Sequence, residues 1–405
     1  MNDSAAAPST PARPPRFVSR VGFGALLSLT MGIGPYVLYV LSTLAPAITR
    51  DLGLTRTQLG SLVTVSFGVA TLFSVLSGGM SDRLGSRRLL FLLYGCTGVA
   101  LAGIALGPTF GWLVAATALA GFSQSSSNPV TNRLVAKRVP AGHRGLLLGV
   151  KQSGVQMSQF FAGAVLPSAA LVMGWRGAAG ASVAFVVVGL VATWLLVPAE
   201  PPQPTPVVRG SSGRSRDPMI PWLAGYGLLI GIIVQGTNVY LPLYSFEELG
   251  FNQQLAGATA GVVGAMGIVA RILWGRGAER LRTAVSPLLI LAALSVAATS
   301  LLWGAASLGP VALWTGAALF AVSALASTVV LMLAVVRGVS AERTGRASGQ
   351  VMLGLYAGFM IGPVLFGSIV DATDGYGAAW GLLTGCAATA TVLCTTWWYR
   401  TQGES

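Results

Sequence analysis

The segment GGMSDRLGSRR, residues 78–88, lies between two long apolar runs. Gly78 would allow a neighbouring helix to approach closely, and Gly85 would permit a tight turn, because glycine has no side chain to obstruct either. Asp82 could accept hydrogen bonds from the N-terminus of a neighbouring helix, where the helix dipole favours a carboxylate. The three arginines of the segment favour the cytoplasmic side of a membrane. The segment therefore indicates a short polar connection between two membrane-spanning helices.

The composition of the whole chain is typical of a membrane protein. Of its 405 residues, 53% are hydrophobic and only 9% are charged, whereas about 25% of a typical soluble domain is charged. A membrane helix needs about 20 mostly apolar residues. The second apolar run begins beside Thr55 and Gln58, which have the spacing of a capping box. Twelve runs predict an all-α membrane protein with twelve transmembrane helices, at residues 21–46, 57–77, 89–106, 111–134, 146–170, 178–197, 219–244, 254–274, 285–304, 310–334, 347–370 and 377–398.

The basic residues test this count of helices. If the N-terminus is cytoplasmic, twenty of the 25 lysines and arginines fall in cytoplasmic segments, and only Arg50, Arg56 and Arg176 fall outside. Miscounting one early helix would destroy this bias, so the positive-inside rule supports an even number of helices with both termini cytoplasmic. The net charge of +13 is scattered in short clusters and does not form a stripe suited to nucleic acid. We expect a multi-pass protein of a bacterial inner membrane.

The chain divides into two similar halves. Residues 198–218 are rich in Pro, Ser, Gly and Arg and are typical of a flexible linker. A weaker copy of the first segment follows 197 residues after Gly78, where Gly275 precedes Glu279 and Arg280 at the same spacing. The copy has no counterpart of Gly85. We predict two pseudo-symmetric six-helix halves, with these parts: a cytoplasmic tail at 1–20, the first half at 21–197, the linker at 198–218, the second half at 219–398 and a second tail at 399–405.

The first segment resembles the signature loop of the major facilitator superfamily: Gly78, three residues, Asp82 and Arg83, one residue, Gly85 and then basic residues that include Arg87. The resemblance implies two parallel six-helix repeats that rock about a central site to give alternating access. We interpret the loop as a clamp that holds one conformational state rather than as a substrate contact.

Two basic residues fall inside predicted spans, Lys151 in the fifth and Arg271 in the eighth, while none of the twelve acidic residues lies in the middle of a span. A charge at mid-membrane costs roughly 2.5–3.5 kcal/mol on insertion scales and usually has a functional reason. Lys151 lies about 10 Å and Arg271 about 12 Å into its helix at 1.5 Å per residue. We predict that both bind an anionic substrate, most simply a carboxylate. The alternative is that both side chains extend to the membrane surface.

The position of Arg271 resembles the eighth-helix arginine of the oxalate/formate exchangers and monocarboxylate transporters, in which that arginine contacts the substrate carboxylate. Those of the oxalate type also carry a lysine in the eleventh helix, where this chain has Gln350 and Tyr356. A dicarboxylate such as oxalate is therefore not the expected substrate.

Further polar residues fall within the predicted spans. A polar side chain at membrane depth either lines a cavity or bonds to another helix. We predict that five of them line a cavity around the substrate: Tyr36, Asn128, Gln156, Asn238 and Tyr356. Hydrogen bonding between helices is the alternative for each.

These features predict a secondary active transporter that moves a small organic anion by alternating access, as a symporter or an antiporter. There is no Walker-type loop for ATP. Protons or a counter-anion are the possible coupling partners, and we expect a monomer without a cofactor or metal site. The alternative is a drug or metabolite exporter of the same fold with neutral or amphipathic cargo. An enzyme is not expected, because the only histidine, His143, lies in a predicted loop and no nucleophile constellation is present.

Overall fold

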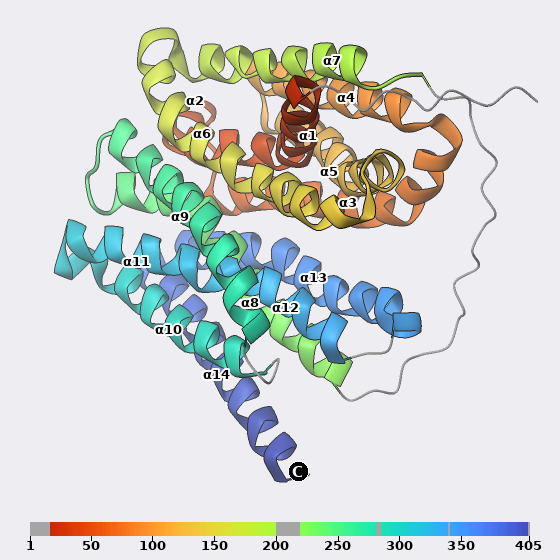
Figure 1. Ribbon diagram of the computed structural model, residues 1–405. Helices are drawn as coiled ribbons and strands as arrows, with labels where there is room; N and C mark the ends of the chain where they lie inside the picture. The colour runs from red at the N-terminus through yellow and green to blue at the C-terminus, as the bar shows by residue number, and fades with distance from the viewer. Residues whose placement is uncertain (1–16, 200–218, 281–284, 339–340, 404–405) are drawn as a thin grey trace, which may run out of the picture.

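The computed structural model describes residues 17–199, 219–280, 285–338 and 341–403, and this part of the chain is helical, with turns between the helices. The N-terminal half contains seven helices (Figure 1): α1 (Phe17–Thr43), α2 (Ala45–Leu52), α3 (Arg56–Leu84), α4 (Ser86–Leu106), α5 (Phe110–Arg138), α6 (Ala141–Ala181) and α7 (Val183–Leu196). The C-terminal half contains α8 (Met219–Glu247), α9 (Gln253–Arg280), α10 (Val285–Leu308), α11 (Pro310–Val322), α12 (Ala324–Gly338), α13 (Ala341–Thr373) and α14 (Gly377–Gly403).

These helices make the twelve predicted passes, with four local differences. The pass predicted at 178–197 is divided at Ser182 between the end of α6 and α7. The helix α2 is a short extra element that begins at a proline after α1 ends. The pass predicted at 310–334 is broken at Ser323 into α11 and α12. The helix α6 contains Gly174 with φ of 72°, a conformation that glycine adopts readily, so the chain bends there between the fifth and sixth passes.

Within the described residues, ten segments are long and apolar enough to cross a membrane. One of them, Leu147–Leu196, has 50 residues and holds the fifth and sixth passes together. The helix α5 is not among the ten, because the polar run near Asn128 lowers its mean hydropathy, although its 29 residues equal the length of α3. The ten segments account for the predicted twelve transmembrane helices when Leu147–Leu196 is counted as two passes and α5 is added.

Two local sequence signals are confirmed at the ends of α3. Thr55 accepts a hydrogen bond from the Gln58 backbone N–H at 3.1 Å, and the Gln58 side chain accepts one from the Thr55 N–H at 3.0 Å. This is the predicted capping box. At the other end, Gly85 has φ of 76° and joins α3 directly to α4. The predicted tight turn is therefore present, in a conformation that a residue with a side chain rarely adopts.

The two halves pack through crossed helix pairs, α6 with α9 and α3 with α13, and Figure 1 shows the N-terminal half above the C-terminal half. Glycines bring the backbones together. A Cβ atom on Gly163 of α6 would lie 2.2 Å from the Gly261 nitrogen of α9, and one on Gly60 of α3 would lie 2.4 Å from the Pro363 oxygen of α13. Within the first half, a Cβ on Gly154 would lie 1.9 Å from the Ser28 oxygen of α1. None of these positions can accept a side chain without movement of a backbone.

The halves are also joined by hydrogen bonds at one end of the molecule, which we call the Arg56 end. Asp371, near the end of α13, accepts hydrogen bonds from the backbone N–H groups of Arg56 and Thr57 at 3.0 and 2.8 Å, and from the Thr57 hydroxyl at 2.6 Å. The carboxylate thus lies at the N-terminus of α3, where the helix dipole favours a negative charge. One half therefore caps a helix of the other.

An ion pair reinforces the Arg56 end. Arg56 pairs with Glu247 of α8 at 3.1 Å, and the Tyr376 hydroxyl donates to the same carboxylate at 2.6 Å. Burial and the nearby Glu247 charge raise the pKa of Tyr376, so its hydroxyl stays protonated and keeps donating. The Tyr240 hydroxyl donates to the Arg56 carbonyl at 2.5 Å. The Arg56 end of the central site is closed in this conformation.

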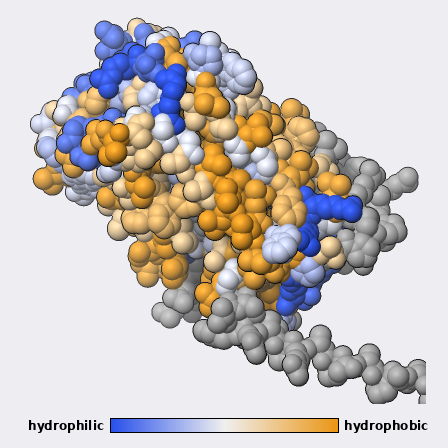
Figure 2. All heavy atoms as spheres, turned by 90° about the horizontal axis from the view of Figure 1, so that it is seen from above, coloured by the Kyte–Doolittle hydropathy of each residue, from blue (hydrophilic) through white to orange (hydrophobic). Residues whose placement is uncertain are grey.

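The surface matches a membrane environment. Apolar residues form a broad middle band on the face seen in Figure 2, and hydrophilic residues gather toward its two ends. Exposed apolar side chains of α7 include Val187, Val191 and Trp194. The chain is a multi-pass integral membrane protein.

The Gly154 contact generates a prediction with a matched control on the same helix. Gly154→Ala should lower the free energy of unfolding by about 1–3 kcal/mol, the usual cost of overpacking. Gly149→Ala should leave it unchanged or raise it by up to about 1 kcal/mol, because a Cβ there meets nothing within 4 Å and alanine favours a helix. Thermal unfolding of the purified variants measures both. Equal midpoints would contradict the tight α1–α6 contact.

The Asp371 cap generates a second prediction. Asp371→Asn replaces one accepting oxygen by an NH2 group. Because the site is partly exposed, this change should favour opening of the Arg56 end by about 1–2 kcal/mol, which is roughly 5–30-fold in the equilibrium between the closed and open conformations. Spin labels at the exposed Val172 and Leu255, on opposite halves, should report a longer distance population. The control is Asp374→Asn, an exposed acid at the same end. An unchanged distance distribution in Asp371→Asn would refute the role of this cap.

Candidate functional site

Lys151 of α6 is buried, with 1% of its surface exposed, and its side chain turns toward α5. Its ammonium group donates three hydrogen bonds: to Asn132 Oδ1 at 2.5 Å, to Thr131 Oγ1 at 3.0 Å and to Asn128 Oδ1 at 3.3 Å. An ammonium has three donors, so protein oxygens accept all of them. These acceptors are uncharged, and the positive charge of Lys151 is therefore solvated by dipoles alone.

This arrangement fixes the orientation of two carboxamides. Lys151 can only donate, so Asn128 and Asn132 must turn their oxygens toward it and their NH2 groups away. Both asparagines are exposed while Lys151 beneath them is buried. Lys151 therefore orients amide donors outward and adds a positive potential behind them.

Asn128 lines a cavity of about 170 Å³ between the halves. No charged side chain of the described residues lines this cavity, and among these residues Gln124 Oε1 is buried without a hydrogen-bond partner. From the C-terminal half, Tyr356 of α13 lines the cavity. The lining residues are Ala70 and Ser74 of α3, Gln124, Ser125, Asn128 and Pro129 of α5, and Tyr356. Polar groups on a small concave surface can orient a small solute by hydrogen bonds.

Arg271 of α9 lies at the contact between the halves but does not line this cavity. Its Nη1 donates to the Gln152 carbonyl of α6 at 3.2 Å, and its guanidinium lies close enough to Tyr39 of α1 for an electrostatic interaction. Its Nε is buried without a hydrogen-bond partner in the described part of the chain. The structure thus places Arg271 of α9 against Gln152, the residue that follows Lys151 in α6, while the Lys151 side chain is directed to α5.

Gln156 and Asn238 lie at the contact between the halves but do not line the cavity. Asn238 of α8 accepts from Gln159 Nε2 at 3.0 Å and donates to Gln235 at 3.2 Å. Gln156 is fully buried, and both polar atoms of its carboxamide lack partners among the described residues. A Cβ on Gly267 would lie 2.9 Å from the Gln156 side chain. Asn238 therefore fits the alternative of helix–helix bonding, whereas Gln156 retains unused donors and acceptors.

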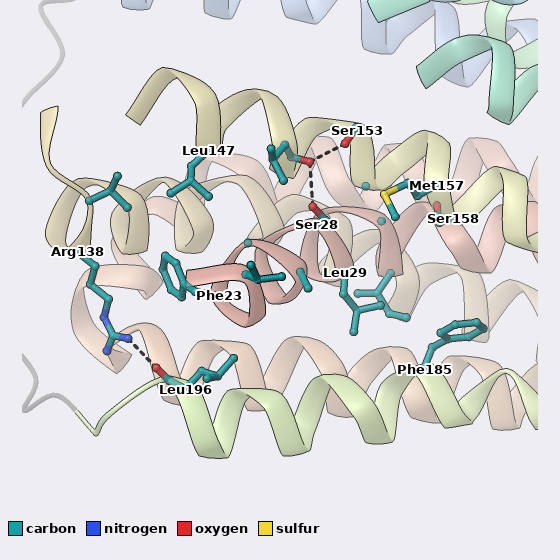
Figure 3. Close-up of a pocket in the computed structure, with 18 of the residues that line it drawn as sticks. Phe23, Ser28, Leu29, Arg138, Leu147, Ser153, Met157, Ser158, Phe185 and Leu196 are labelled. Carbon is teal, nitrogen blue, oxygen red and sulfur yellow. Dashed lines mark hydrogen bonds between the residues drawn. The ribbon is translucent and has the colours of Figure 1, made fainter. Parts of the chain in front are cut away.

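Tyr36 does not lie with these residues. Its hydroxyl bonds to Ser182 at 3.0 Å, its ring packs on Phe185 at 5.3 Å, and it lines a different cavity of about 960 Å³ between α1, α6 and α7 (Figure 3). Tyr36 therefore does not line the cavity at Asn128 in this conformation, because this face of α1 turns toward α7. This larger cavity was not predicted from the sequence. The available signal was the row of small residues Gly24, Ser28 and Gly32 at four-residue spacing in α1.

The residues of the signature segment are described only in part. Arg87 donates to the Trp194 carbonyl at 3.5 Å and lies over the Phe91 ring at 5.7 Å, so it ties α4 to α7. The backbones of the other predicted motif residues are helical, but their side chains lie outside the described part of the structure: Gly78, Asp82, Arg83, Gly275, Glu279 and Arg280.

The fold is similar to that of solved transporters. A nucleoside transporter, NupG, gives a TM-score of 0.76 at 13% identity, over 93% of this chain and 99% of that one. A bacterial homologue of the human lysosomal transporter Spinster, in an inward-facing and unoccupied conformation, gives a TM-score of 0.69 at 16% identity, over 94% of this chain and 96% of that one.

Curated relatives are also transporters. A probable sulfoacetate transporter of Cupriavidus necator is 25% identical over 87% of this chain and 88% of its own length. The hexuronate transporter of Bacillus subtilis is 26% identical over the same shares of the two chains. A niacin transporter of Acinetobacter baylyi is 25% identical over 55% of this chain and 49% of its own length. The family model of the Major Facilitator Superfamily matches residues 27–363, and the chain therefore belongs to this superfamily.

Proposed function

We propose that this transporter carries a small organic anion, most simply a carboxylate, between the two halves. The observation that carries the proposal is the buried Lys151, whose charge is solvated only by neutral oxygens and whose partners Asn128 and Asn132 must present NH2 groups outward. Superfamily membership makes the chain a secondary transporter and not an enzyme.

Electrostatics favour an anion over a cation or a neutral solute. A buried positive charge without a counter-charge raises the potential of the nearby cavity, and interactions at low dielectric are stronger than in water. A cationic cargo would meet repulsion from Lys151 and no carboxylate to offset its desolvation. An anion would accept hydrogen bonds from Asn128 and from the Tyr356 hydroxyl while lowering the energy of the buried ammonium. Lys151 acts in this proposal as a positioning residue behind the donors.

Arg271 supplies the second contact of the proposed site. The guanidinium has five donors, of which one bonds to the Gln152 carbonyl and the Nε donor has no described partner. A bidentate guanidinium matches a carboxylate well. Because Arg271 approaches from the C-terminal half and Asn128 from the N-terminal half, an anion held by both would couple its binding to the relative position of the halves.

The named substrates of the relatives are consistent with this class. Sulfoacetate, hexuronate and niacin each carry an acidic group that is ionised at neutral pH, and the first two relatives align with most of this chain. The three molecules differ in size and in their neutral groups. We infer the shared feature, the anionic group, and not one of these compounds.

The closed Arg56 end gives the direction in which the site is accessible. The basic residues place the opposite end in the cytoplasm by the positive-inside rule, so this conformation is inward-facing in our proposal. Without an acidic residue in the middle of a span, anion exchange or uniport requires no protein carboxylate. Proton symport would use the carboxylate of the substrate, Lys151, or the acids Asp51 and Asp371 near the Arg56 end.

A ligand panel tests the substrate class. Small carboxylates should raise the midpoint of thermal unfolding of the purified protein, whereas the corresponding neutral amides and lipophilic cations should not, because a ligand stabilises the state that binds it. Lys151→Met should weaken carboxylate binding at least about 10-fold, equivalent to 1.4 kcal/mol. Lys137→Met removes the other lysine of the chain and should leave binding unchanged. Stabilisation by cations or neutral compounds that persists in Lys151→Met would support the exporter alternative and refute the anion site.

The variant Asn128→Asp tests substrate binding without an expected loss of folding stability. The new carboxylate would pair with Lys151 and remove the positive potential of the cavity, so carboxylate uptake into proteoliposomes should fall at least about 10-fold. The thermal stability without ligand should be retained, because a buried lysine gains a counter-charge. Asn252→Asp is the control: Asn252 is exposed at the start of α9 and accepts from the Leu255 N–H through a side-chain oxygen that aspartate retains. Full uptake by Asn128→Asp would rule out Asn128 as a substrate contact.

A further inference from the structure

The larger cavity has the shape of a groove on one side of the N-terminal half. Figure 3 shows α6 and α7 on opposite sides of α1, with Leu29 and Met157 directed into the space between them. The cavity has a volume of about 960 Å³. Its lining on α1 runs from Val21 to Tyr36, which corresponds to about 22 Å at 1.5 Å per residue. This length exceeds one leaflet of a hydrocarbon core that is about 30 Å thick.

The inside of this groove is apolar and offers few free polar groups. Three serines line it, and each donates to a backbone carbonyl: Ser28 and Ser153 to Val150 at 2.9 and 2.7 Å, and Ser158 to Val155 at 2.7 Å. The end of the groove near the middle of the molecule is aromatic, where Phe185 packs against Tyr36 and Phe161. A hydrophilic solute would therefore find little to bind inside the groove.

The groove opens on the outside of the bundle and not on the central site. All its lining residues belong to the N-terminal half, and α7 packs on α1, α4 and α6 of that half. Met157 and Phe161 line the groove and are each 40% exposed. The neighbouring α7 presents an exposed apolar face that includes Val187 and Val191. In a membrane, hydrocarbon chains are what such an opening meets.

One end of the groove carries positive charge. Arg138, at the end of α5, donates to the Leu196 carbonyl at 2.7 Å and lies over the Phe23 ring at 5.8 Å, which holds its guanidinium at the mouth (Figure 3). His143 also lines this end and is exposed. Arginine at a membrane surface attracts anionic lipid headgroups. The groove thus combines a cationic mouth with an apolar interior.

We propose that this groove binds a phospholipid of the surrounding bilayer, with an anionic headgroup at Arg138 and an acyl chain along α1. The charge at the mouth and the apolar interior match the two parts of such a lipid, and their separation along α1 matches its length. The lipid would fill the space between α6 and α7 and support the packing of both on α1. This site is separate from the proposed anion site and does not depend on it.

Native mass spectrometry of the whole protein tests the proposal after reconstitution in vesicles of phosphatidylglycerol and phosphatidylcholine with identical acyl chains. The wild-type protein should retain lipid, with phosphatidylglycerol enriched over its share of the vesicles. Met157→Trp should fill the groove and reduce retained lipid at least about 10-fold, equivalent to 1.4 kcal/mol. Val165→Trp is the matched control, because Val165 is exposed two turns further along α6 and does not line the groove. Equal lipid retention by both variants and the wild type would overturn the site.

A second pair of variants tests the headgroup. Arg138→Gln should retain lipid but lose the preference for phosphatidylglycerol, whereas Lys137→Gln, which alters a neighbouring residue outside the groove, should keep it. Inorganic phosphate should not displace the lipid, since the acyl chain contributes most of the contact. An unchanged preference in Arg138→Gln, or displacement by phosphate, would overturn the assignment. Gly24→Met is a second groove-filling variant in case Met157→Trp does not fold, because a Cβ at Gly24 meets only the side chains of Leu147 and Val150, at 3.6 and 4.0 Å.

Discussion

Contact between helix backbones at glycines is the constraint on which the arrangement of this molecule depends. Lipid provides no hydrophobic driving force between helices, so association relies on close packing of small residues and on hydrogen bonds. The chain has 53 glycines. Gly154 joins α1 to α6 within one half, while Gly163 and Gly60 join α6 to α9 and α3 to α13 between the halves. Contacts between the halves that rely on glycine lack interlocking side chains, and such surfaces can separate and meet again during transport.

The candidate site follows from a second constraint, the satisfaction of charge away from water. Lys151 is stabilised by three oxygens of α5, and these same bonds determine which atoms Asn128 and Asn132 present to their surroundings. The last polar residue of the run in α5, Asn128, and the following Thr131 and Asn132 are therefore accounted for by one buried cation of α6. The cost of keeping Lys151 in the membrane is offset by neutral dipoles, and a substrate anion would add a counter-charge.

Features that depend on neighbouring residues could be predicted from the sequence. The capping box at Thr55, the turn at Gly85 and the number of passes each rest on a local spacing or a run of composition. Features that depend on the rotation of a helix against its neighbours could not be predicted from the sequence. Lys151 and Arg271 share a depth, but the rotation of α6 directs Lys151 to α5. Tyr36 has the composition of a cavity residue, yet it faces α7. Pairing of Asp371 with Arg56 joins residues 315 positions apart, and no local pattern indicates it.

The start of α3 is capped from two sources. Thr55 and Gln58 satisfy donors from within the same chain segment, and Asp371 satisfies the N–H groups of Arg56 and Thr57 from the other half. When the halves separate, the capping box remains, so the helix end does not unwind. The two backbone donors and the Thr57 hydroxyl must exchange the Asp371 carboxylate for water, and Arg56 must release Glu247 and the Tyr240 hydroxyl. Opening of the Arg56 end therefore requires rehydration of polar groups on both halves, while the first turn of α3 keeps its own cap.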